Sequence, residues 1–91
     1  MIKIQVEETL LKEVNVSKKA ITYVVRTLET RIQMEKRKRF FLQSTPLNIG
    51  MVLEKTTVQN EVIITIIQII PGDMYLNTGM LTRELQEVLE K

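Results

Sequence analysis

The residues Glu61–Gly72, EVIITIIQIIPG, constrain the fold more than any other stretch of the chain. The nine residues from 62 to 70 include six isoleucines and only two polar side chains, Thr65 and Gln68. Branching at the β carbon favours an extended strand over a helix. Pro71 and Gly72 then end the segment with turn chemistry. We therefore predict a central β-strand here.

This predicted strand is apolar on both of its faces. Strict alternation puts one apolar set on one face (Val62, Ile64, Ile66 and Ile70) and a second set on the other (Ile63, Ile67 and Ile69). Because a strand of this kind must be covered on both faces, it needs more than one layer of packing.

The size and composition of the chain predict one domain spanning residues 1–91, with a modest and mostly aliphatic core. Its hydrophobic fraction is 44%, while its aromatic fraction is only 4%. No apolar run approaches the roughly 20 residues needed to cross a bilayer. The first ten residues turn acidic too early for a secretion signal. We expect a cytoplasmic protein without a membrane partner.

Two residue types that often perform catalysis are missing. The chain has no cysteine and no histidine, so it lacks a thiolate nucleophile and the commonest general base and metal ligand. None of its three glycines belongs to a phosphate-binding glycine loop. A carboxylate pair or a lysine amine stays formally open as a catalyst. We expect no enzyme, no catalytic residue, no metal and no cofactor.

The first half of the chain predicts one strand and two helices. Residues 1–6 alternate in polarity, as in a half-buried strand. A short helical pattern follows and ends near Asn15. Ser17 is the best N-cap in the sequence, and it precedes a long amphipathic helix over Lys18–Met34. Residues Ser44–Asn48 are expected to form a loop.

The second half predicts a hairpin and a final helix. Met51–Val58 is rich in strand-forming residues, and Gln59-Asn60 is a candidate tight turn into the isoleucine-rich strand. Gly79–Lys91 has leucine and valine at helical spacing. The predicted fold class is α+β, with a small three-stranded, mainly antiparallel sheet and two amphipathic helices on one face. The predicted order of elements is β-α-α-β-β-α.

One helical layer leaves Ile63, Ile67 and Ile69 facing water. At about 25 cal/mol per Å², this exposure forgoes several kcal/mol of burial. Two solutions are open: the short helix and the apolar segment Phe40–Leu42 cover the second face, or another subunit does. The prediction favours a homodimer, with these three isoleucines at a partner interface.

The basic run Lys36-Arg37-Lys38-Arg39, next to two phenylalanines, is the strongest candidate for a binding site. Such charge density suits phosphates, and exposed rings can stack on unpaired bases. The alternative is a solvated helix end whose phenylalanines return to the core. Lys18 and Lys19 are further candidates, although they begin the same predicted helix about 27 Å away.

MIKIQVEETLLKEV has the pattern of a strand and an opening helix, and NVSKKAITYVVRTL that of a turn and a second helix. In this order of elements the first thirty residues resemble the ribbon-helix-helix DNA-binding proteins. This resemblance implies that Lys3 and Gln5 read DNA in a dimer and that Ser17 lies near the phosphates. The first helix is shorter than in that family, and the plain alternative is that Lys3 and Gln5 form the wet face of an edge strand.

The leading hypothesis from the sequence is a small non-catalytic regulator that binds nucleic acid, DNA or RNA, as a homodimer. Its proposed binding residues are Lys36, Arg37, Lys38, Arg39, Lys18 and Lys19. The alternative is a protein-interaction module, an inhibitor or assembly factor, which acts through the apolar sheet face or the C-terminal helix.

Overall fold

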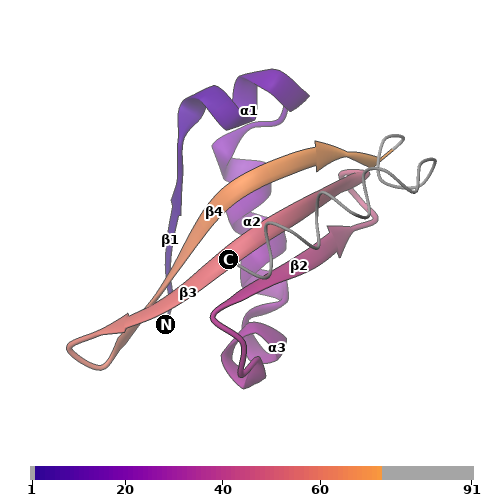
Figure 1. The fold of residues 1–91 in the computed structure, drawn as a ribbon. Coiled ribbons are helices and arrows are strands. Elements are labelled where there is room, and N and C mark those ends of the chain that lie inside the picture. Colours follow the sequence, from indigo (N-terminus) through magenta and orange to yellow (C-terminus); the bar gives the residue numbers. More distant parts are fainter. Residues whose placement is uncertain (1, 73–91) are drawn as a thin grey trace.

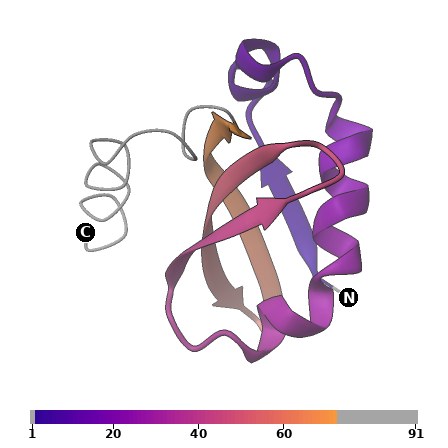
Figure 2. The same ribbon diagram turned by 90° about the vertical axis from the view of Figure 1, so that its right-hand side faces the viewer.

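A computed structural model describes residues 2–72 of the chain, and they form an α+β fold. One layer is a mixed four-stranded sheet, and the other contains the helices. Figure 2 shows the longest described helix, Lys18–Thr27, on one side of the sheet and the shorter helices near its two ends. The predicted C-terminal helix, Gly79–Lys91, lies outside the described residues. No helix within residues 2–72 is long and apolar enough to cross a bilayer.

The strands are β1 (Lys3–Val6), β2 (Arg39–Ser44), β3 (Ile49–Val58) and β4 (Glu61–Pro71). The helices are α1 (Glu8–Val14), α2 (Lys18–Thr27) and α3 (Glu29–Met34). The sheet order is β1-β4-β3-β2, with β1 parallel to β4 and the other neighbouring pairs antiparallel. Figure 1 shows β1 and β2 at the two edges.

The predicted three-stranded sheet is wrong, because β2 is a fourth strand. Phe40 and Leu42 lie opposite Leu53 and Met51 of β3, and all four side chains are buried. The short apolar segment at Phe40–Leu42 therefore extends the sheet instead of covering its second face. Ser44 ends this strand and does not begin a loop, and its hydroxyl accepts a hydrogen bond from the Leu47 backbone N–H at 3.3 Å.

The predicted helix ends in the first half of the chain are largely confirmed. Ser17 caps α2, since its side chain accepts a hydrogen bond from the Ala20 backbone N–H at 3.1 Å. Asn15 ends α1 in the left-handed conformation, with φ at 54°. The single helix predicted over Lys18–Met34 is divided, because Leu28 has non-helical angles (φ −103°, ψ 11°) between α2 and α3.

The predicted hairpin between β3 and β4 is confirmed, with Val58 opposite Glu61. Both turn residues have positive φ, 51° at Gln59 and 66° at Asn60. This pair of angles suits a two-residue turn that follows the right-handed twist of the strands. Gln59 therefore adopts a conformation that asparagine or glycine adopts more readily.

A β-bulge at Ile67 changes which isoleucines of β4 enter the core. Leu53 lies opposite Ile66, but the preceding Val52 lies opposite Gln68, so Ile67 is an extra residue. Beyond the bulge the alternation is reversed. Ile69 joins the core beneath the helices, at 6% exposure, and Ile70 turns to the opposite face. Ile69 therefore lies in the protein's own core and not on the sheet face where the sequence placed it with Ile63 and Ile67.

The main core lies between the helices and one face of the sheet. Its fully or nearly fully buried members include Ile21, Val25, Ile32, Phe40, Met51, Leu53, Ile64 and Ile66. Ile4 and Val6 of β1 pack against this cluster, while Lys3 and Gln5 are exposed. The predicted alternation of the first strand is thus confirmed.

Candidate nucleic-acid interface

The basic run lies in the connection from α3 to edge strand β2, and Lys55 of β3 anchors this connection. The Lys55 ammonium donates hydrogen bonds to the carbonyl oxygens of Ile32 at 3.1 Å and Gln33 at 3.4 Å, and also to that of Glu35. The last carbonyls of a helix have no partner within the helix, and an ammonium group has three donors to offer. The Lys55 backbone N–H donates to the Lys38 carbonyl at 2.7 Å. The two ends of the loop are therefore attached to one residue.

Glu35 and Arg37 form an ion pair within the loop. The Arg37 Nε donates to Glu35 Oε1 at 2.8 Å, the Arg37 Nη2 to Glu35 Oε2 at 3.3 Å, and the Arg37 backbone N–H to Oε1 at 3.1 Å. These hydrogen bonds, first of all the one from the Arg37 side chain, lower the pKa of Glu35 from 4.5 to about 2. Glu35 therefore stays ionised near neutral pH and offsets the charge of Arg37. The Arg37 side chain is still 68% exposed.

Arg39 and Glu54 form a second ion pair, between β2 and β3. They are direct cross-strand partners, and Arg39 Nη2 lies 2.6 Å from Glu54 Oε2. The hydrogen bond from Arg39 lowers the pKa of the Glu54 carboxyl. Arg39 is only partly exposed, so this cation fastens the edge strand more than it extends the binding surface.

The surface around the basic run stays positive after the two ion pairs are taken into account. Residues 35–39 together with Glu54 and Lys55 contain five cations and two carboxylates, which leaves a net charge of +3. Lys36, Arg37 and Lys38 are exposed on the anchored loop. We call these three residues the basic loop. It offers positive charge at a fixed place in the fold.

A shallow groove of about 540 Å³ runs along α3 to the start of this loop. Its lining includes Arg31, Glu35 and Met34, and the Met34 side chain is 75% exposed. The sequence analysis did not single out Arg31 or Met34. The signal was present, because Met34 is the last residue of the predicted helix Lys18–Met34 and Arg31 is a cation five positions before Lys36.

Lys18 and Lys19 do not join the basic loop. Both are exposed in the first turn of α2, next to α1, while the basic loop follows α3 at the other end of the helical layer (Figure 1). The six predicted binding residues therefore form two separate groups. Only the four from Lys36 to Arg39 lie together.

Phe40, next to the basic run, agrees with the alternative interpretation, in which the phenylalanines return to the core. Phe40 is 1% exposed within the core cluster, so it is not available to stack on a base. Phe41 faces the opposite side of the sheet and is half-buried. Binding at the basic loop would therefore depend on charge and not on aromatic stacking.

The strand residues singled out by the ribbon-helix-helix resemblance lie at the edge of the four-stranded sheet. Lys3 and Gln5 are exposed on β1, which is an edge strand paired in parallel with β4. The Thr65 hydroxyl donates a hydrogen bond to Gln5 Oε1 at 3.3 Å. This arrangement agrees with the plain alternative, the wet face of an edge strand.

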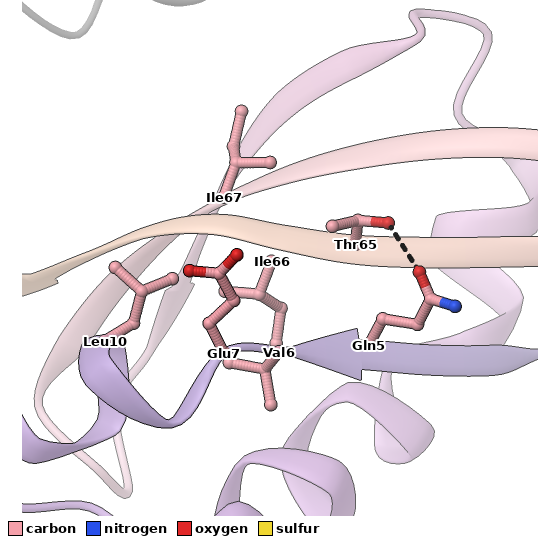
Figure 3. Close-up of a pocket in the computed structure, with 7 residues that line it drawn as sticks. All are labelled: Gln5, Val6, Glu7, Leu10, Thr65, Ile66 and Ile67. Carbon is pink, nitrogen blue, oxygen red and sulfur yellow. Dashed lines mark hydrogen bonds between the residues drawn. The ribbon is translucent and has the colours of Figure 1, made fainter.

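A cavity of about 360 Å³ lies where β1 leads into α1, and the sequence analysis did not find it. Figure 3 shows its lining, in which Glu7 provides the one carboxylate among Gln5, Val6, Leu10, Thr65, Ile66 and Ile67. A single carboxylate beside an amide and a hydroxyl gives too few ligands for a metal ion. Across residues 2–72, no group of three or more acidic side chains is placed to hold one.

Comparison with known proteins adds no assignment. No family model matches the chain, and no curated protein or solved structure is significantly similar to it.

Proposed function

We propose that this protein is a small non-catalytic regulator that binds nucleic acid through the basic loop, Lys36, Arg37 and Lys38. The observation that carries the proposal is the anchoring of this loop by Lys55, which holds three exposed cations at one corner of the fold. A preformed loop loses little conformational entropy on binding. Phosphates of the nucleic acid would displace the counterions near these cations, so the affinity would depend strongly on salt.

The test is charge reversal at Lys36 and Lys38, both to glutamate. The matched control reverses Lys18 and Lys19, which changes the net charge equally at the other end of the helical layer. Fluorescence anisotropy with labelled single-stranded RNA, single-stranded DNA and duplex DNA measures the affinity at several salt concentrations. We expect the Lys36→Glu/Lys38→Glu variant to bind more weakly, and the magnitude of its slope of log K against log salt to fall by about 1.4 to 1.8.

The control variant should keep most of the affinity and of the salt slope. Equal losses in both variants would show that net charge alone matters and that the basic loop has no special role. If the unmodified protein binds none of the three probes, the proposal is wrong. The alternative of a protein-interaction module then becomes the better hypothesis, because it depends on the apolar sheet face and not on the loop.

A homodimer and a cytoplasmic location stay predictions from the sequence. The reason for the homodimer is weaker than the sequence indicated, since the bulge puts Ile69 into the protein's own core. Light scattering at micromolar concentration measures the oligomeric state independently of nucleic-acid binding.

A further inference from the structure

The helical layer has an exposed stripe that leads to the basic loop. The buried and half-buried residues of the two helices recur at one helical spacing across the interruption between α2 and α3: Ile21, Val25, Leu28 and Ile32. Residues two positions further along therefore point to the opposite side of both helices. All four of them are exposed, and we call them the outer stripe: Tyr23, Thr27, Thr30 and Met34.

The groove along α3 lies at the end of the outer stripe where the chain continues into the basic loop (Figure 1). Its volume of about 540 Å³ is within the range of sites that bind small organic groups. Leu28 and the exposed side chain of Met34 provide its apolar surface, and Arg31 provides a cation. The groove can therefore hold a flat group that is apolar on its faces.

Arg31 is available to a ligand. The carboxylate one helical turn further on, Glu35, is occupied by the Arg37 side chain through two hydrogen bonds. Arg31 takes part in no ion pair within residues 2–72, and it is exposed. Its planar guanidinium can therefore stack on a ligand or donate hydrogen bonds to it.

We propose that the nucleic acid bound by this protein is single-stranded, and that the groove along α3 binds one of its unpaired bases. The inference rests on the proposed function, in which the basic loop binds the phosphates. The adjoining base would lie over Arg31 and Met34, because a guanidinium plane and a polarisable thioether both pack against the face of a flat ring. A base inside a duplex is paired and stacked, so it cannot enter the groove until the duplex opens.

Tyr23 provides a second stacking surface on the outer stripe. Among the aromatic residues of the described part of the chain it is the exposed one, since Phe40 is buried and Phe41 is half-buried. Its side chain is 71% exposed. Tyr23 precedes Met34 by eleven residues, or about 16 Å of helix, which a few nucleotides can span. One strand could therefore contact the basic loop, the groove and this ring together.

The charge and the shape of this surface favour a nucleic acid over an acidic peptide. The groove and the basic loop together contain one carboxylate, Glu35, and four cations, which leaves a net charge of +3 and favours an anionic ligand. A peptide anchored by an apolar side chain needs a well-packed, desolvated pocket. The groove is shallow, and a base can stack on such a surface through one face.

The experiment uses the full chain and three fluorescently labelled probes of one length. The first is a single strand of deoxythymidines, the second is the same backbone with abasic sites in place of the bases, and the third is a duplex. The first two have the same phosphates and differ only in their bases. Fluorescence anisotropy measures all three affinities at one salt concentration.

Three substitutions test the stacking residues without changing the net charge: Tyr23→Ala, Met34→Ala and Arg31→Lys. The lysine keeps the positive charge but loses the guanidinium plane. The matched control is Val58→Ala, which truncates an apolar side chain that is 53% exposed at the β3-β4 hairpin. All four positions are exposed, so the variants should fold, and thermal unfolding followed by circular dichroism checks this.

We expect the unmodified protein to bind the deoxythymidine strand at least tenfold more tightly than the abasic strand, and more tightly than the duplex. Tyr23→Ala should weaken binding of the deoxythymidine strand at least fivefold. Met34→Ala and Arg31→Lys should each weaken it about two- to tenfold. Binding of the abasic strand and of the duplex should change less than twofold in all three variants, and Val58→Ala should change no affinity.

The outcomes separate this inference from the proposed function. Equal affinity for the deoxythymidine and abasic strands, or equally tight binding of the duplex, would show that only phosphates are recognised, and the inference would be wrong while the proposed function stands. Binding that does not respond to charge reversal at Lys36 and Lys38, or no binding to any probe, would overturn both. If the three substitutions weaken binding of a labelled peptide of alternating glutamate and leucine but not of the deoxythymidine strand, the groove is a peptide site and the inference is wrong.

Discussion

The two faces of β4 carry the same kind of side chain and differ in their surroundings. Ile64, Ile66 and Ile69 are at most 6% exposed, in one cluster with Leu11 of α1 and Ile21 of α2. Ile63 and Ile67 lie on the opposite face of the strand, which we call the second face, and are only half-buried. Isoleucine content alone therefore does not say which face forms the main core. The position of the helices and the bulge at Ile67 decide it.

Two neighbouring polar residues of β3, Glu54 and Lys55, also point to opposite faces of the sheet. Lys55 points to the helix side, where its ammonium closes the end of α3. Glu54 points to the second face, where it pairs with Arg39 of the edge strand. One residue holds the helical layer to the sheet, and the other holds the edge strand to its neighbour.

The largest expected difference between the faces comes from introducing a charge. Ile69→Asp should destabilise the protein by at least about 4 kcal/mol, because it places a carboxylate in the core without a partner. Ile63→Asp should keep cooperative unfolding, since its side chain can reach water. Urea unfolding followed by circular dichroism measures both. Equal loss at the two positions would contradict the reversal of alternation at the bulge.

Truncation of the isoleucines tests the same contrast without a charge. Ile66→Ala should cost about 2 to 5 kcal/mol, since it leaves a cavity in a cluster that cannot collapse fully. Ile67→Ala removes a half-buried side chain and should cost about half as much or less. Unfolding free energies from urea titration provide the comparison, and a larger cost at Ile67 than at Ile66 would contradict the assignment of the faces.

Replacement of Lys55 tests the anchoring of the basic loop. Lys55→Met keeps the aliphatic stem but leaves the last carbonyls of α3 without their donor, which should cost about 1 to 3 kcal/mol. Hydrogen exchange of the backbone amides from Glu35 to Lys38 should accelerate. The control, Lys36→Met, removes an exposed charge from the loop and should change stability by less than about 0.5 kcal/mol. Unchanged exchange in Lys55→Met would show that the loop is held by other contacts.

The smallest expected effect is at the ion pair on the second face. Glu54→Gln should cost about 0.2 to 1 kcal/mol at pH 7, as is typical of partly exposed pairs. Because the pKa of Glu54 is lowered in the folded protein, the stabilisation is present above the ordinary value of 4.5 and is lost as the pH falls through the folded pKa. Urea titrations at pH 7 and pH 3 should therefore show a smaller difference between variant and parent at pH 3.

Much of the local structure could be predicted from the sequence. The alternation of residues 1–6, the Ser17 cap, the Asn15 stop and the hairpin turn at Gln59-Asn60 were each indicated by neighbours within a few positions. The aliphatic core also followed from composition. Of the candidate site, the sequence located the basic run but not its ion pairs, since Glu54 is 15 residues from Arg39 along the chain.

Only the tertiary structure decided how these elements combine. β1 pairs with β4 across some sixty residues, with Lys3 opposite Ile63, and no local pattern specifies that pairing. The bulge reversed the faces of Ile69 and Ile70 because one extra residue shifts a period of two. Lys55 became the anchor of the basic loop because the carbonyl oxygens that it binds belong to residues 20 to 23 positions earlier in the chain. Local propensities act between neighbours in the chain, whereas burial and hydrogen bonding are decided by residues that meet only when the layers pack.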